Sequence, residues 1–116
     1  MVDCKRIYLA SPFTHEDFVV RLARKKVVTE CSARLLSEGQ LVFSPIVYGA
    51  MLAEGKSPLP VSWDFWEKLD ASFLKNWATE LWVLKMEGWE KSVGIREEIS
   101  IAEELNLPVV FLECDL

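Results

Sequence analysis

Four short runs of apolar residues alternate along the chain with three longer segments in which apolar residues recur at helical spacing. The apolar runs cover residues 4–11, 40–45, 80–86 and 107–113. The longer segments cover residues 14–39, 62–77 and 92–105. A period of 3.6 residues indicates an amphipathic helix, and a short continuous apolar run indicates a buried strand. The chain is therefore predicted to fold into alternating strands and helices.

This alternation is typical of a parallel sheet with right-handed crossover helices on both faces. We predict an α/β fold, with residues 1–116 forming one three-layer, flavodoxin-like domain of four to five parallel strands in the order 2-1-3-4. Ligands of such sheets bind beyond the carboxyl ends of the strands where the strand order reverses, here between the first and third strands. Residues 11–13 and 86–92, which follow these strands, should therefore meet in one crevice.

Capping and turn residues predict where the helices begin and end. Thr14 is the expected N-cap of the first helix, with Glu16 and Asp17 in its first turn, and Gly39 is the expected end. Residues 46–61 contain glycine, proline and small side chains. We expect a loop there with at most a short helical turn, and loops of this length are usually functional or mobile.

The third predicted helix contains two adjacent glutamates, Glu97 and Glu98. Glu98 follows Ile95 by three residues and precedes Ala102 by four, so it lies in the middle of the apolar stripe. Glu97 points about a third of a turn away. A carboxylate on a buried face needs a partner or a function. Glu98 is therefore a candidate catalytic residue, although a stripe glutamate near a helix start can also extend outward to solvent.

Asp70 occupies the equivalent position on the second predicted helix. It follows Trp66 by four residues and precedes Phe73 by three, in the middle of an aromatic stripe. A buried aspartate often only accepts backbone N–H groups. Two inward carboxylates, on two helices that face the same crevice, favour a joint role for Asp70 and Glu98.

Small and polar residues beside the crevice are candidates for substrate binding. Ser92 and Gly94 lie at the start of the third helix, where free N–H groups can hold a phosphate or a sugar hydroxyl. Ser11, after the first strand, is a similar candidate. Each of these features is weak by itself, because most such serines only cap a helix.

Tryptophans near the crevice are candidates for stacking on a base. Trp89 lies in the loop before the third helix, and Trp63 and Trp66 open the second. Aromatic side chains are enriched in ligand sites, but tryptophan in a small hydrophobic core is the more common arrangement.

Charge and cysteine content exclude several classes of partner. The net charge of −5 argues against nucleic acid or an anionic membrane, because both require a basic surface. The basic run of residues 21–26 is interpreted as a solvated helix face. Three widely spaced cysteines without a CxxC pair are typical of free thiols in a reducing cytoplasm. We expect no metal, no cofactor, no transmembrane segment and a cytoplasmic protein.

Three stretches resemble the nucleoside 2-deoxyribosyltransferase superfamily: "IYLASP", "WDFWEKLDASFL" and "SVGIREEISIAEELNLPVVF". The most specific pattern is a late S-x-G-x-x-x-E-x-x-x-A, which is satisfied here by Ser92, Gly94, Glu98 and Ala102. Its register selects Glu98 rather than Glu97, as the helical stripe does independently. "GWEKSVGIREEI" together with "FSPI" is similar to a small uncharacterised branch of bacterial and phage proteins in that superfamily.

The resemblance implies cleavage or transfer of an N-glycosidic bond in a nucleoside, nucleotide or related ribosyl compound. It implies that Glu98 is the nucleophile and that Asp70 positions the sugar or helps to protonate the leaving base. Tyr8 corresponds to an aromatic residue near the nucleophile. The residues implied to contact substrate are Ser92 and Gly94 at the 5′ end and Ser11 at phosphate or sugar.

Two departures from the better-known enzymes concern base recognition and activity. The loop before Ser92 carries the bulky Trp89, and residues 46–61 have no obvious counterpart. The alternatives to an enzyme are therefore a non-catalytic domain that binds or senses a nucleotide, and an interaction protein that oligomerises through its aromatic surface. A homo-oligomer is expected with either an enzyme or an interaction protein.

Overall fold

The computed structural model describes residues 4–57, 59–60 and 62–114. Within this part of the chain, four parallel strands form one sheet in the order β2-β1-β3-β4. The central strands are β1 (Arg6–Ala10) and β3 (Glu80–Lys85), and the edge strands are β2 (Leu41–Phe43) and β4 (Val109–Glu113). Tyr8 of β1 is aligned with Phe43 of β2 and with Leu81 of β3. The predicted parallel sheet and its order are confirmed.

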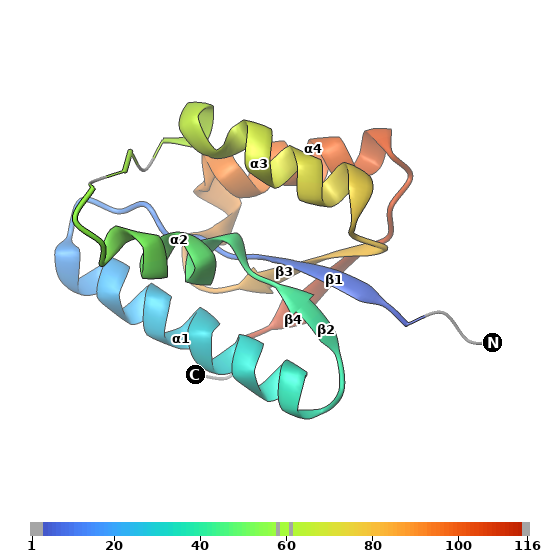
Figure 1. The fold of residues 1–116 in the computed structure, drawn as a ribbon, viewed down its shortest axis with the longest axis horizontal. Coiled ribbons are helices and arrows are strands. Elements are labelled where there is room, and N and C mark those ends of the chain that lie inside the picture. The colour runs from blue at the N-terminus through green and yellow to red at the C-terminus, as the bar shows by residue number, and fades with distance from the viewer. Residues whose placement is uncertain (1–3, 58, 61, 115–116) are drawn as a thin grey trace.

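Helices cover both faces of the sheet, which confirms the three-layer α/β arrangement (Figure 1). On one face α3 (Trp63–Asn76) packs beside α4 (Val93–Glu104). On the other face α1 (Phe18–Ser37) packs beside α2 (Pro45–Ala53). A short 3-10 helix, η1 (Trp89–Lys91), precedes α4. None of the helices in the described ranges is long and apolar enough to cross a membrane.

Successive residues of β1 enter different hydrophobic cores because side chains alternate across a strand. Tyr8 and Ala10 belong to the core beneath α3 and α4. Leu9 belongs to the core beneath α1, with Val28. All four of these side chains are fully buried, as expected for a parallel strand covered on both faces. This alternation points the Tyr8 ring toward α4, where Glu98 lies.

The start of α1 differs from the prediction. Asp17, not Thr14, is the N-cap, and its side chain accepts a hydrogen bond of 2.8 Å from the backbone N–H of Val19. The expected acidic first turn is therefore absent, since Asp17 precedes the helix. The other end is confirmed: Gly39 has a φ of 90°, a left-handed conformation that suits glycine after a helix.

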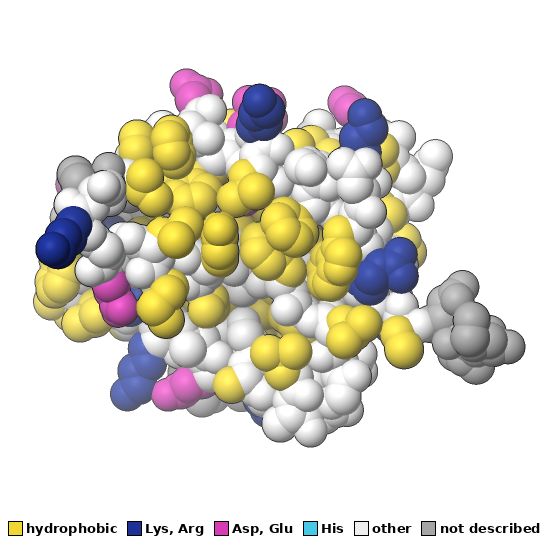
Figure 2. All heavy atoms as spheres, in the orientation of Figure 1, with side chains coloured by type: hydrophobic (Ala, Val, Ile, Leu, Met, Phe, Trp, Pro, Cys, Tyr) yellow, Lys and Arg dark blue, Asp and Glu magenta, His cyan; other side chains and the backbone are white. Residues whose placement is uncertain are grey.

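Residues 46–61 were expected to form a loop with at most a short helical turn, and this expectation is wrong for residues 46–53, which are helical. Residues 54–57 and 59–60 contain neither helix nor strand, as expected, and residues 58 and 61 lie outside the described residues. The nine-residue helix α2 begins at Pro45, and the Ser44 hydroxyl accepts a hydrogen bond of 3.1 Å from the Val47 N–H. Serine as the N-cap followed by proline at the first helical position is a favoured start for a helix. The apolar side chains of α2 form part of a band across the face between α2 and α3 (Figure 2).

Candidate active site

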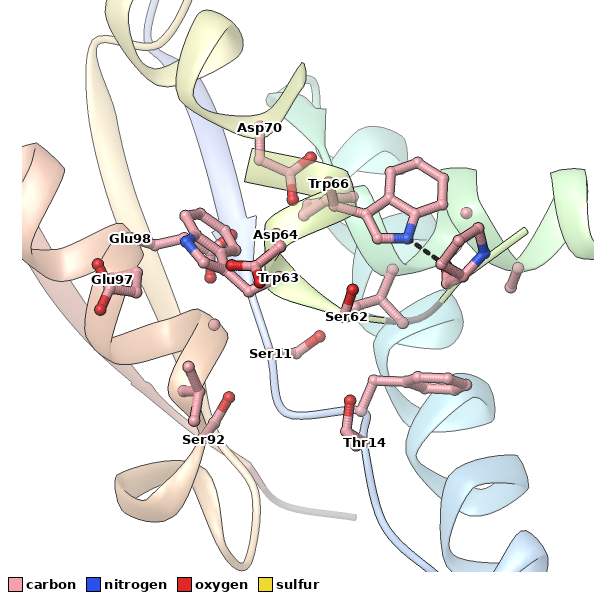
Figure 3. Close-up of a pocket in the computed structure, with 18 of the residues that line it drawn as sticks. Ser11, Thr14, Ser62, Trp63, Asp64, Trp66, Asp70, Ser92, Glu97 and Glu98 are labelled. Atoms are coloured by element: carbon pink, nitrogen blue, oxygen red, sulfur yellow. Dashed lines mark hydrogen bonds between the residues drawn. The ribbon is translucent and has the colours of Figure 1, made fainter. Parts of the chain in front are cut away.

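A cavity of about 760 Å³ opens at the carboxyl end of β1, within the range typical of ligand sites. One wall comes from α3 and α4, the opposite wall from α2, and the floor from the loop after β1 (Figure 3). The predicted segments contribute Ser11 and Phe13 on one side and Lys91 and Ser92 on the other. The structure thus brings the two loops together as the strand order predicts.

Glu98 and Asp70 both line this cavity and are both only 5% exposed. They approach it from α4 and α3 respectively (Figure 3). The Tyr8 hydroxyl, which is buried behind the cavity wall, donates a hydrogen bond to Oε2 of Glu98. Residues separated by ninety positions in sequence are therefore joined in one buried polar group. Both helical stripes predicted these inward orientations correctly.

Burial raises the pKa of both carboxyl groups, because removal from water disfavours their charged forms. The pKa of Glu98 is raised to about 8, with the Tyr8 hydrogen bond partly opposing the effect of burial and the Asp70 charge adding to it. Burial also raises the pKa of Asp70, to about 7, and the hydroxyl of Tyr8 partly opposes this increase. Burial and the two carboxylates raise the pKa of Tyr8 well above its usual value. Tyr8 therefore remains a hydroxyl donor.

Two polar atoms on the cavity wall have no hydrogen-bond partner within the described chain. They are Oδ1 of Asp70 and Oγ of Ser11, and both are buried. A buried polar atom without a partner costs about 1–3 kcal/mol, so its persistence needs an explanation. Both side chains line the same hollow (Figure 3). A polar ligand in the cavity can supply the missing partners.

The start of α4 forms the lower rim of the cavity. The Ser92 hydroxyl accepts a hydrogen bond of 3.2 Å from the Ile95 N–H, so Ser92 caps the helix as well as lining the cavity. Gly94 lines it beside Ser92. A Cβ placed on Gly94 would lie 3.9 Å from Ser92 Oγ and from Trp63 Cε3, which is ordinary van der Waals contact. Packing within the described chain therefore permits a larger residue at this position.

The structure separates the three candidate tryptophans. Trp63 and Trp66 line the cavity, and the Trp66 ring is fixed by a hydrogen bond of 2.8 Å from its Nε1 to the Pro60 carbonyl. Trp89 does not line it. Its ring lies 5.4 Å from that of Phe111 on β4 and packs against the core beneath α3 and α4. The predicted substrate contact of Trp89 is thus not made at this cavity, because η1 turns the side chain toward the sheet edge.

Arg24 holds the two loops that flank the cavity, a role that its place in a basic run concealed. Its guanidinium donates hydrogen bonds of 3.0 Å to the carbonyls of Thr14, after β1, and Glu87, after β3. Gly88, with a φ of 88°, allows the close approach, since a Cβ there would lie 2.7 Å from Arg24 Nη2. Arg24 therefore joins these two loops and is not merely part of a solvated face.

Several residues that line the cavity were absent from the sequence-based prediction. The wall from α2 includes Ile46, Gly49 and Ala50, and the helix start that carries them could have been found from Ser44 and Pro45. Asp64 and Glu97 are exposed carboxylates at the rim. This group includes Ile46, Gly49, Ala50, Asp64 and Glu97. In the ranges that the structure describes, no three His, Cys, Asp or Glu side chains form a group able to hold a metal ion.

Fold and site together define an α/β domain of the doubly wound type with a cavity where the strand order reverses. The chain belongs to the family described as Domain of unknown function (DUF1937), which matches residues 5–114. A search of curated proteins found no match to the chain.

Substitution of Gly94 by alanine tests whether the rim of the cavity is reserved for a ligand. Alanine favours a helix interior by about 1 kcal/mol over glycine and should gain less here, because Gly94 is the second residue of α4, so the variant is expected to unfold at a similar or slightly higher temperature. The added methyl group projects beside Trp63 and Ser92 and should weaken ligand binding by about tenfold or more, since small displacements in a site are costly. Calorimetry and ligand titration measure the two effects, and unchanged binding would contradict a role for Gly94.

Proposed function

We propose that the protein cleaves or transfers the N-glycosidic bond of a nucleoside, nucleotide or related ribosyl compound, with Glu98 as the nucleophile. The observation that carries this proposal is the pair of buried carboxyl groups, Glu98 and Asp70, on one open cavity with Tyr8 donating to Glu98. The resemblance of the surrounding sequence to the nucleoside 2-deoxyribosyltransferase superfamily supports the same chemistry.

The proposed reaction begins when a Glu98 carboxylate oxygen attacks the anomeric carbon of the sugar. The bond from that carbon to the base nitrogen breaks, and its electron pair remains on the base. Positive charge that develops on the sugar is stabilised by the apposed carboxylate. Asp70, with a pKa near 7, supplies a proton to a base that leaves as an anion. Water then releases free sugar, or a second base accepts it.

The remaining cavity residues have distinct proposed roles. Tyr8 orients the Glu98 carboxylate through its hydrogen bond. Ser11, whose hydroxyl has no partner in the described residues, donates to the sugar. Ser92 and Gly94, at the start of α4, bind the 5′ end of the substrate, where the helix dipole favours polar or negative groups. Assembly into a homo-oligomer and a cytoplasmic location remain predictions.

Incubation with a panel of substrates tests the proposal. The panel comprises deoxynucleosides, ribonucleosides, nucleoside 5′-monophosphates and NAD, and free base is separated by chromatography. We expect release from at least one class. Binding without release would support the sensing alternative. If the protein neither binds nor cleaves any member of the panel, the proposal of a nucleoside site is contradicted.

A further inference from the structure

Charged side chains are unevenly distributed around the cavity. Four carboxyl groups line it, whereas Lys91 is the one basic side chain that lines it within the described ranges. Two of the four, Asp70 and Glu98, are buried, and the other two, Asp64 and Glu97, are exposed at the rim. Burial keeps Asp70 and Glu98 partly protonated near neutral pH, so the exposed pair, Asp64 on α3 and Glu97 on α4, supplies the negative charge that faces the cavity from both helices. A positive group entering between these helices would be attracted from two sides.

Aromatic rings occupy the same end of the cavity as the carboxyl groups. Trp63 precedes Asp64 on α3, and Figure 3 shows these two residues on the side toward Glu98, with Trp66 beside Asp70 and its ring directed away from Glu98, toward Pro60. Trp66 is held in place by its hydrogen bond to Pro60. Tryptophan is the aromatic side chain that attracts a cation most strongly. The other end carries the hydroxyl groups of Ser11, Thr14 and Ser92, whereas Ser62, the N-cap of α3, lies beside Asp64 and Trp66.

An independent observation concerns the carboxyl group of Asp70. Oδ1 of Asp70 is buried, lines the cavity and has no hydrogen-bond partner within the described chain. A carboxyl group left in this condition is costly. A ligand with positive charge or an N–H donor, placed beside the reacting carbon, would satisfy it.

We infer that the cavity selects nucleosides whose base carries a positive charge, such as an N-ribosyl pyridinium or an N-alkylated purine. This inference rests on the proposed function. The hydroxyl end receives the sugar, and the base lies among Asp64, Glu97 and the two tryptophans. In the hydrolysis of such a substrate, the electron pair of the broken bond neutralises the ring nitrogen. The base then leaves without receiving a proton, and the water that attacks the sugar releases one proton.

A pair of ligands that differ by one charge tests this inference. Oxidised nicotinamide riboside carries a pyridinium cation, and its 1,4-dihydro form is neutral and of nearly the same shape. Binding of both to the Glu98→Gln variant, in which turnover is removed, is measured by calorimetry. We expect the cation to bind at least ~10-fold more tightly, which corresponds to about 1.4 kcal/mol.

Matched variants assign the preference to the rim. Asp64→Asn with Glu97→Gln should reduce the ratio of the two affinities to within about threefold, since the nearby charges are removed. Glu67→Gln with Glu104→Gln changes the net charge equally on the same two helices, at exposed positions outside the cavity. This control pair should leave the ratio unchanged. If the ratio of the two affinities falls equally in both double variants, the assignment of the preference to Asp64 and Glu97 is overturned.

The outcomes separate this inference from the proposed function. Three outcomes would overturn the cation preference alone. The two forms bind equally, the neutral form binds more tightly, or neither form binds while other nucleosides still release base. No binding and no base release with any nucleoside would overturn both.

Discussion

Substitution of Glu98 by glutamine is expected to stop the release of free base while making the protein more stable above neutral pH. Glutamine has nearly the same shape and can still accept the hydrogen bond from Tyr8, but it cannot form the covalent intermediate. Loss of a carboxylate nucleophile should lower kcat/KM by about 10³-fold or more, which corresponds to roughly 4 kcal/mol of barrier.

The gain in stability follows from the raised pKa of Glu98. The pKa is about 8 in the folded chain against an ordinary value of 4.5, so between these values the folded state holds a proton that the unfolded state has released. The free energy of unfolding therefore falls as pH rises through this window. Asp70 adds a similar decline between its ordinary pKa of 3.8 and about 7. A glutamine at position 98 does not titrate, so the variant lacks the part of this decline in the free energy of unfolding that Glu98 causes.

Thermal unfolding of both proteins at two pH values measures this effect. At about pH 5 the melting temperatures should be similar, and at about pH 8.5 the variant should be more stable by about 2–4 kcal/mol. For a domain of this size that difference raises the melting temperature by about 5–15 °C. A variant that is less stable at both pH values would show that Glu98 is a structural residue.

The adjacent Glu97→Gln substitution is the matched control. Glu97 is exposed at the rim, so replacing its side chain should change the free energy of unfolding little. Its melting temperature should follow that of the natural sequence at both pH values, and activity toward a neutral nucleoside should change by less than about threefold. Equal loss of activity in both variants would contradict the assignment of Glu98 as nucleophile.

Inward orientation was predictable from sequence because helical periodicity relates residues only a few positions apart. Glu98 lies between Ile95 and Ala102, and all three are buried. Asp70 is buried with Leu74 on α3. The order of the strands was equally accessible, since short crossovers and right-handed connections leave few layouts for a chain of this length.

Features that depend on contacts between distant segments were not predictable in this way. Trp89 packs on Phe111 of β4, and no local pattern distinguishes that contact from a place in the cavity. Arg24 lies in a basic run, yet its guanidinium donates hydrogen bonds to the carbonyls of Thr14, ten residues away, and Glu87, sixty-three residues away. The hydrogen bond from Tyr8 to Glu98 likewise depends on the tertiary arrangement, although the superfamily resemblance placed the two residues near each other.

The wall formed by α2 was missed for a different reason. The sequence from Ser44 to Ala53 contains a favourable helix start, but its glycine and the small residues that follow favoured a loop. A Cβ at Gly49 would lie 3.6 Å from the Trp66 ring, which is ordinary van der Waals contact, so α2 packs against Trp66 at this glycine without requiring it. Helix propensity is a weak guide where tertiary packing of this kind decides.

Substitution of Asp70 by asparagine is expected to slow the reaction by an amount that depends on the leaving base. With its pKa near 7, Asp70 is partly protonated at neutral pH and can deliver a proton, whereas asparagine cannot. Release of a base that departs as an anion should fall by about 10²–10⁴-fold. Release of a pyridinium base, which needs no proton, should fall by less than about tenfold.

The dependence of kcat/KM on pH distinguishes proton donation from positioning of the sugar. The reactive form for a neutral nucleoside has Glu98 ionised and Asp70 protonated. Because the pKa of Glu98 is about 8 and that of Asp70 is about 7, this form is a minor one, and the rate should rise to about pH 7, stay level to about pH 8 and fall above it. Asp70→Asn should remove the decline at alkaline pH, because the group that loses the proton is gone. Asp64→Asn, the same change at the exposed rim of α3, should retain that decline. If Asp70→Asn slows both kinds of leaving base equally, Asp70 positions the sugar and the proton reaches the base from another group.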